Sequence, residues 1–224
     1  MADEGFIAVP SAALPFGQKL SFDLYLQVGG NLVLYATAGA CLDQEQVQRL
    51  SRNSQSNFFA QRKDPAYLKY YEENLSRILD EPRTATRVKS QVFYHVSTNL
   101  VKNILDDPRS GATVKRSQAV VQNLVGFVLV QKDAFFNLLK ITSHDYYTYT
   151  HSVNVCTLAV GLALRLGIRT RADCSLVGLG GLLHDVGKCM VDLPILNKRG
   201  PLTDEEWQVM RKHPEWGADR KSVV

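Results

Sequence analysis

This chain of 224 residues lacks a large excess of charge, a long apolar run and a signal peptide. Each of these absences excludes a class of protein. The charges nearly balance, with 26 lysines and arginines against 22 aspartates and glutamates, so we expect no surface for a nucleic-acid polymer. No apolar run approaches the ~20 residues of a membrane span. The N-terminus, MADEGFIAVP, has two early acids and no apolar core, unlike a signal peptide. We therefore expect a cytoplasmic protein with no membrane span.

Cysteine is also scarce. The four cysteines, Cys41, Cys156, Cys174 and Cys189, form no CxxC pair and lie in apolar stretches. Structural zinc sites usually take their cysteines from closely spaced pairs, and disulfides are rare in the cytosol. This pattern predicts buried, reduced thiols and no zinc site.

The first 64 residues have the short alternating patterns of strands. Residues 20–26 alternate apolar with mostly polar side chains, and residues 32–35 follow the turn sequence Gly29-Gly30-Asn31, which together predict a hairpin. Asp43 and Gln46 could cap a helix over residues 44–52, and residues 58–59 could form one more strand. We predict a small α+β accessory domain over residues 1–64, without chemistry of its own.

From residue 65 onward the apolar period becomes helical. One helix is predicted over residues 67–79, a second from residue 88 to near 108, and a third over residues 114–139. Three shorter helices follow at 151–166, 171–184 and 204–212. Gly167 has the position of a C-cap, and Thr203 with Glu206 forms a capping box. We expect a helical connecting region over residues 65–140 and a second, all-α domain over residues 141–224.

The main chemical signal is the sequence His184-Asp185-Val186-Gly187-Lys188. It places a histidine and an aspartate at the end of an apolar helix, where a charged carboxylate needs a cation as partner. An imidazole supplies one neutral metal ligand, and a carboxylate can bridge two ions ~3.5–4 Å apart. Lys188 would place a positive charge where a phosphate group could approach.

Two more histidines lie at predicted helix ends on either side of this sequence. His151 begins the apolar helix before it, and His213 precedes Pro214 after it. Taken singly, His151 could be an ordinary N-terminal helix residue and His213 a capping or turn residue. Together with His184 and Asp185, they could converge in an antiparallel bundle, so the pattern favours a metal site.

The arrangement of a histidine, HDxGK and HPxxG resembles the HD superfamily of metal-dependent phosphohydrolases, specifically its HD-GYP branch. Residues 193–203 and 144–152 resemble the same branch. The resemblance is strong over residues 140–218. It implies an α+β accessory domain followed by an all-α HD-type helical bundle, and an accessory domain often precedes HD-GYP domains in bacteria.

The resemblance implies an activity and a set of site residues. The activity would be hydrolysis of cyclic di-GMP in bacterial second-messenger signalling, with two divalent metal ions, iron or manganese, as cofactors. His151, His184, Asp185 and His213 would be metal ligands, and Asp185 would bridge the ions. Asp185 and Lys188 would be the catalytic residues, with Lys188 steadying the phosphate.

The sequence departs from the family in two places. Tyr147 stands where members with three metals have a glutamate, and a phenol is a poor ligand at neutral pH, so we expect two ions. The family's later histidine pair, GYP segment and aspartate ligand do not follow. We expect this polypeptide alone, an incomplete bundle, to be inactive and poorly stable. Residues 219–224 resemble translated sequencing adapter, although a genuine short variant with a basic tail is the alternative.

Three hypotheses of function are consistent with these motifs. The first is a cyclic di-GMP phosphodiesterase as the intact gene product. The second is another HD-superfamily hydrolase of nucleotides or phosphoesters. The third is a non-catalytic HD-like scaffold, although such scaffolds usually lose the ligand residues that are present here. A homodimer or a signalling-protein partner is compatible with all three.

Overall fold

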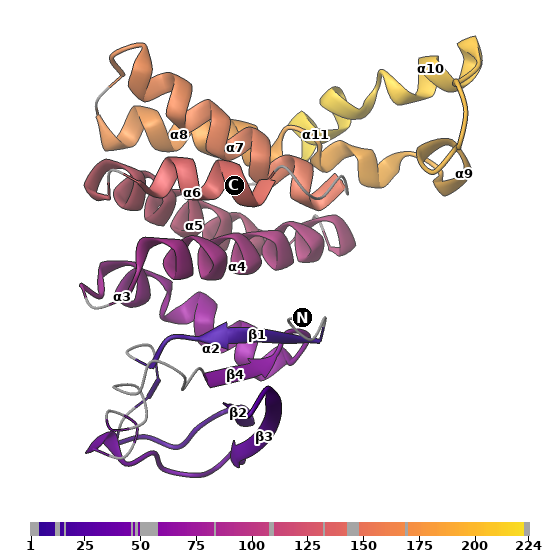
Figure 1. Ribbon diagram of the computed structural model, residues 1–224. Coiled ribbons are helices and arrows are strands. Elements are labelled where there is room, and N and C mark those ends of the chain that lie inside the picture. Colours follow the sequence, from indigo (N-terminus) through magenta and orange to yellow (C-terminus); the bar gives the residue numbers. More distant parts are fainter. Residues whose placement is uncertain are drawn as a thin grey trace. The chain divides into compact units, whose positions relative to one another are not determined.

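The computed structural model describes residues 5–11, 14–15, 17–45, 47, 49, 58–82, 84–107, 110–131, 133–142, 148–168 and 170–221 (Figure 1). The chain divides into two compact units, Met1–Val92 and Phe93–Val224. The expected class, an α+β N-terminal region followed by a largely helical one, is confirmed. The domain boundaries placed at residues 64 and 140 stay predictions.

The first unit contains a four-stranded antiparallel sheet in the order β1-β4-β2-β3. Its strands are β1 (Phe6–Val9), β2 (Leu24–Val28), β3 (Asn31–Ala36) and β4 (Phe58–Gln61). The predicted hairpin is β2–β3, with Val28 paired to Asn31. Gly29 and Gly30 turn the chain with φ of 57° and 86°, a left-handed pair that glycine adopts without strain. Strand β1 was not predicted from the sequence.

The predicted helix over residues 67–79 is in fact two helices, α2 (Pro65–Glu73) and α3 (Leu75–Asp80). Asp64 caps α2 by accepting a hydrogen bond from the backbone N–H of Ala66 at 2.8 Å. The break falls at Asn74, whose side-chain amide donates to the Tyr70 carbonyl at 2.8 Å. Such local bonds compete with helix continuation. The helix predicted over 44–52 falls largely outside the described residues.

The second unit is built from helices around a buried apolar core. Helix α4 (Thr86–Asp106) crosses from the first unit, and α5 (Gly111–Val130), α6 (Ala134–Thr142), α7 (Thr148–Arg165) and α8 (Arg171–Leu183) follow. The single helix predicted over 114–139 is therefore wrong. Helix α5 ends where the Gln131 N–H donates to the Phe127 carbonyl, and α6 starts three residues later. Apolar residues lie on both sides of the break, so the sequence pattern predicts one continuous helix.

Helices α7 and α8 lie side by side (Figure 1), and α8 also packs on α5. Two glycines of α8 make this possible. A Cβ atom built at Gly181 would lie 3.0 Å from the Cα of Cys156, and one at Gly178 would lie 2.8 Å from Val160 Cγ2. The backbones of the two helices therefore approach closely near the C-terminal end of α8.

Short elements complete the second unit. They are the 3-10 helix η2 (Val186–Met190), α9 (Leu193–Leu196), α10 (Asp204–Met210) and α11 (His213–Lys221). The predicted capping box is confirmed, since the Thr203 hydroxyl accepts from the Glu206 N–H while the Glu206 carboxylate accepts from the Thr203 N–H. The C-cap at Gly167 has φ of 88° and is also as predicted. Within the described residues, none of the helices combines the length and apolarity that crossing a bilayer requires.

The cysteines differ from one another in burial. Cys156 and Cys174 are buried as predicted, Cys189 is half-buried, and Cys41 is exposed, which contradicts the expectation for that residue. Burial raises the pKa of the Cys156 thiol to about 12, so this thiol stays protonated near neutral pH. We expect iodoacetamide at pH 8 to label Cys41 first and Cys156 only after unfolding in urea, as followed by mass spectrometry. Equal labelling rates in the folded protein would contradict this order.

Candidate metal centre

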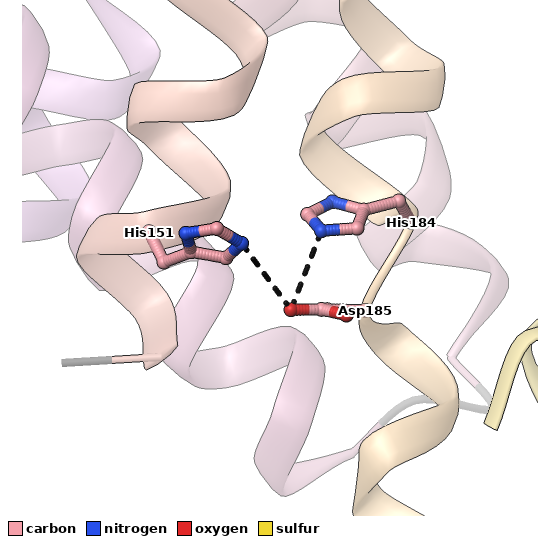
Figure 2. A group of neighbouring side chains, drawn as sticks. All are labelled: His151, His184 and Asp185. Carbon is pink, nitrogen blue, oxygen red and sulfur yellow. Dashed lines mark ion pairs between the residues drawn. The ribbon is translucent and has the colours of Figure 1, made fainter. Parts of the chain in front are cut away.

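Four elements bring the predicted ligand residues together. His151 lies in the first turn of α7, His184 ends α8, Asp185 leads into η2, and His213 begins α11. Figure 2 shows the first three, with both imidazoles directed at one carboxylate oxygen of Asp185. The ligand atoms of these three residues all lie within 4.8 Å of one another. Residues far apart in the sequence thus meet around one carboxylate.

Asp185 is the centre of the group. Its side chain is 4% exposed, whereas the side chain of His151 is 52% exposed, so the site opens to solvent beside His151. Oδ2 lies 3.3 Å from His184 Nε2 and 3.7 Å from His151 Nε2. The other oxygen, Oδ1, lies 3.5 Å from His213 Nε2. The two carboxylate oxygens therefore face different histidines.

The tautomers of two histidines follow from their backbone contacts. His184 Nδ1 lies 2.8 Å from the Gly181 carbonyl oxygen, and His213 Nδ1 lies 2.7 Å from the Met210 carbonyl oxygen. A carbonyl oxygen only accepts, so each Nδ1 carries a proton and donates it. In the neutral imidazole, Nε2 then presents its lone pair to Asp185. Metal-binding histidines in proteins commonly have this arrangement.

These donor atoms fit a divalent cation. A lone pair facing a carboxylate oxygen is unfavourable unless a positive charge stands between them. The separations of 3.3–3.7 Å exceed an ordinary hydrogen bond. By contrast, two donors bound ~2.1 Å from one ion stand about 3.0–3.5 Å apart. Imidazole nitrogen with carboxylate oxygen also suits iron or manganese.

Lys188 supplies a positive charge to the same group. Its Nζ donates to Asp185 Oδ2 at 2.7 Å, one turn along the chain. The lysine side chain is 24% exposed, so its flexible stem has access to solvent. Lys188 thus neutralises the carboxylate from the side that His151 and His184 also face.

Some residues named from the sequence lie outside the described residues, and some contacts of the site were not predicted. Tyr147 and the residues 143–146 before it lie outside the described residues. The carbonyls of Gly181 and Met210, which orient His184 and His213, were missed. In each case the acceptor lies three residues before the histidine, a spacing that could have indicated the contact.

A protein-family model matches the part of this chain that contains the site. The family model described as "HD domain" matches residues 148–221, which contain His151, His184, Asp185, Lys188 and His213. Residues 148–221 therefore form an HD domain, as the motif predicted. The fold is also similar to that of the solved Bd1817, an HDG"Y"P protein of Bdellovibrio bacteriovorus. Its TM-score is 0.59 at 22% identity, over 96% of this chain and 71% of that one.

Curated relatives match part of this chain at higher identity. The cyclic di-GMP phosphodiesterase PA4108 of Pseudomonas aeruginosa is 40% identical over 120 residues, which cover 53% of this chain and 29% of the relative. The 3'3'-cGAMP-specific phosphodiesterase 2 of Vibrio cholerae is 30% identical over 89 residues, or 39% of this chain and 17% of the relative. This chain thus matches less than a third of either relative's length. The relatives act on cyclic dinucleotides, in agreement with a phosphohydrolase of the HD class.

Proposed function

We propose that the complete gene product is a metal-dependent phosphodiesterase that hydrolyses cyclic di-GMP. The observation that supports this most is the pair of opposed carboxylate oxygens on Asp185, each facing a different histidine. Such an arrangement suits two divalent ions on either side of one bridging carboxylate. The 40% identity to a cyclic di-GMP phosphodiesterase supports that substrate over other phosphoesters.

Each residue has a role in this proposal. His151, His184 and Oδ2 of Asp185 would hold one ion, and His213 with Oδ1 would hold the other. Bound ions would supply the charge that polarises the phosphodiester and lowers the pKa of attacking water. In hydrolysis the water oxygen bonds to phosphorus, one ester P–O bond breaks, and the leaving ribose oxygen takes a proton. The first product would be the linear dinucleotide, followed by GMP.

Lys188 would change partner during the reaction cycle. It contacts Asp185 Oδ2 on the side where the first ion would bind, so ion and ammonium compete for this oxygen. The flexible lysine stem would then let Nζ reach the substrate phosphate. Lys188 would thus balance the charge of Asp185 before the ion binds and the charge of the phosphate afterwards.

Replacing Lys188 by methionine tests this double role. Removing a cation within hydrogen-bond distance of Oδ2 should tighten Mn²⁺ binding by about fivefold, the equivalent of ~1 kcal/mol between close charges. Hydrolysis at saturating Mn²⁺ should fall by about 100-fold, as when one donor to a developing anion is lost. Mn²⁺ affinity is measured by calorimetry, with Lys102→Met, on the exposed side of α4, as the matched control. Weaker Mn²⁺ binding in the Lys188 variant would refute the competition.

The function itself is tested by turnover. The product of the complete reading frame at the source locus is loaded with Mn²⁺ or Fe²⁺ and given cyclic di-GMP, 3'3'-cGAMP and a simple aryl phosphodiester, with products separated by chromatography. We expect preferential conversion of cyclic di-GMP to the linear dinucleotide. Turnover of the aryl ester alone would favour another HD hydrolase, and ion binding without any turnover would favour a scaffold.

A further inference from the structure

The helix contact that positions His213 differs from the one that positions His151 and His184. His151 and His184 belong to α7 and α8, which pack along their lengths. His213 instead begins α11, and the described element against which α11 packs most closely is the short helix η2. The placement of His213 Nε2 at 3.5 Å from Asp185 Oδ1 therefore rests on how α11 meets η2.

This contact is made by backbone atoms at two buried glycines, Gly187 in η2 and Gly217 in α11. A Cβ atom built at Gly187 would stand 2.6 Å from the backbone nitrogen of Gly217 and 2.8 Å from the carbonyl carbon of His213. It would lie closer still to the carbonyl oxygen of His213. Backbone atoms cannot rotate away as a side chain can, so any residue other than glycine at position 187 must displace α11.

The clash at Gly187 would move the residue that carries the ligand. The nearest atom is the carbonyl oxygen of His213 itself, so the displacement is applied directly to His213. The pair His151 and His184 would be spared, because their helices meet on another face of α8 through Gly178 and Gly181. A change at Gly187 should therefore affect the two sides of Asp185 unequally.

We propose that Gly187 is a positioning residue that sets His213 against Asp185 Oδ1 and so controls ion binding on that side alone. This inference rests on the proposed two-ion centre. Gly187 contacts neither an ion nor the substrate, and it acts through the backbone of His213. Gly217 forms the other side of the same contact, with more room, since a Cβ there would lie 3.4 Å from the Gly187 nitrogen.

The test is a Mn²⁺ titration of the full chain, followed by calorimetry and by the electron paramagnetic resonance of bound Mn²⁺. Gly187→Ala should keep one binding event and weaken the second by about 10- to 100-fold, the usual cost of disturbing what orients a ligand. His213→Ala should give the same pattern. The double variant should lose no more than His213→Ala alone, because both changes act on one ligand.

Three controls separate this role from general damage to the fold. Gly180→Ala, on an open part of α8 with no atom within 4 Å of its Cβ position, should bind both ions as the unmodified chain does. Gly217→Ala should show a smaller loss of the same second event, and it replaces Gly187→Ala if that variant does not fold. Equal loss of both events, additive effects in the double variant, or no loss at all would overturn the proposal. If the unmodified chain binds no ion, the proposed metal centre fails instead.

Discussion

Replacing Asp185 by asparagine should abolish the binding of divalent ions while leaving the protein folded. Asparagine keeps the size of the side chain and removes its negative charge. Each proposed ion uses one oxygen of this carboxylate, so both should be affected. Disturbing the residues that orient ligands already costs about 10- to 100-fold in affinity. We therefore expect a loss of about 100-fold or more for each ion, and no detectable hydrolysis.

The stability of this variant distinguishes loss of the ions from loss of the fold. In the metal-free protein, Asp185 is a buried charge paired with Lys188, and removing one partner of such a pair is costly when the other charge is left buried. Lys188 retains access to solvent once its partner is neutral. The melting temperature in the presence of EDTA should therefore stay the same or rise. A variant that melts earlier in EDTA and still binds Mn²⁺ would show that Asp185 serves the fold and not the ions.

A second large effect is expected at Gly181, one of two neighbouring glycines of α8. Gly181 faces α7, where its Cβ would lie 3.2 Å from the backbone nitrogen of Cys156, whereas Gly180 is exposed with no atom within 4 Å. In Gly181→Val, the valine methyl groups would enter the backbone of α7 and force the helices apart. Overpacking of this kind costs about 1–3 kcal/mol. Ion binding should weaken as well, because His151 and His184 lie on the separated helices.

Gly180→Val is the matched control for that change. The same side chain is added one residue earlier on the same helix, where valine has a slightly higher helix propensity than glycine. Its free energy of unfolding, measured with urea, should stay within about 0.5 kcal/mol of the unmodified chain. If the two variants unfold at the same urea concentration, the close approach of α7 and α8 is not what holds this part of the site together.

Much of the site was predictable because its chemistry is local in the sequence. The order His184-Asp185 at a helix end, followed by Lys188, placed three site residues within one turn and a half. Thr203 and Glu206 likewise predicted the start of α10, since a capping box depends only on residues three apart. The convergence of His151 and His213 on this group was expected from their places at predicted helix ends, and the family resemblance supported it. Local patterns alone do not give the contacts between distant helices.

What could not be predicted depends on competition between local and long-range contacts. The tyrosines of α2 and α3 continue one apolar stripe, yet the Asn74 amide bond to Tyr70 interrupts the helix. Strand β1 is four residues long and exists through its pairing with β4, more than forty positions later. Helix α11 was not predicted, because His213 beside Pro214 could be a capping or turn residue. Proline is in fact well placed in a first helical turn, where its missing N–H would have no partner.

The central claim is that two divalent ions bind on opposite sides of the Asp185 carboxylate. The most direct measurement is an anomalous difference map from crystals of the protein soaked with Mn²⁺, recorded on both sides of the manganese absorption edge. The account predicts two peaks, one between Oδ2 and the pair His151 and His184, the other between Oδ1 and His213. Peaks elsewhere, with Lys188 still bound to an Asp185 that contacts no ion, would contradict it.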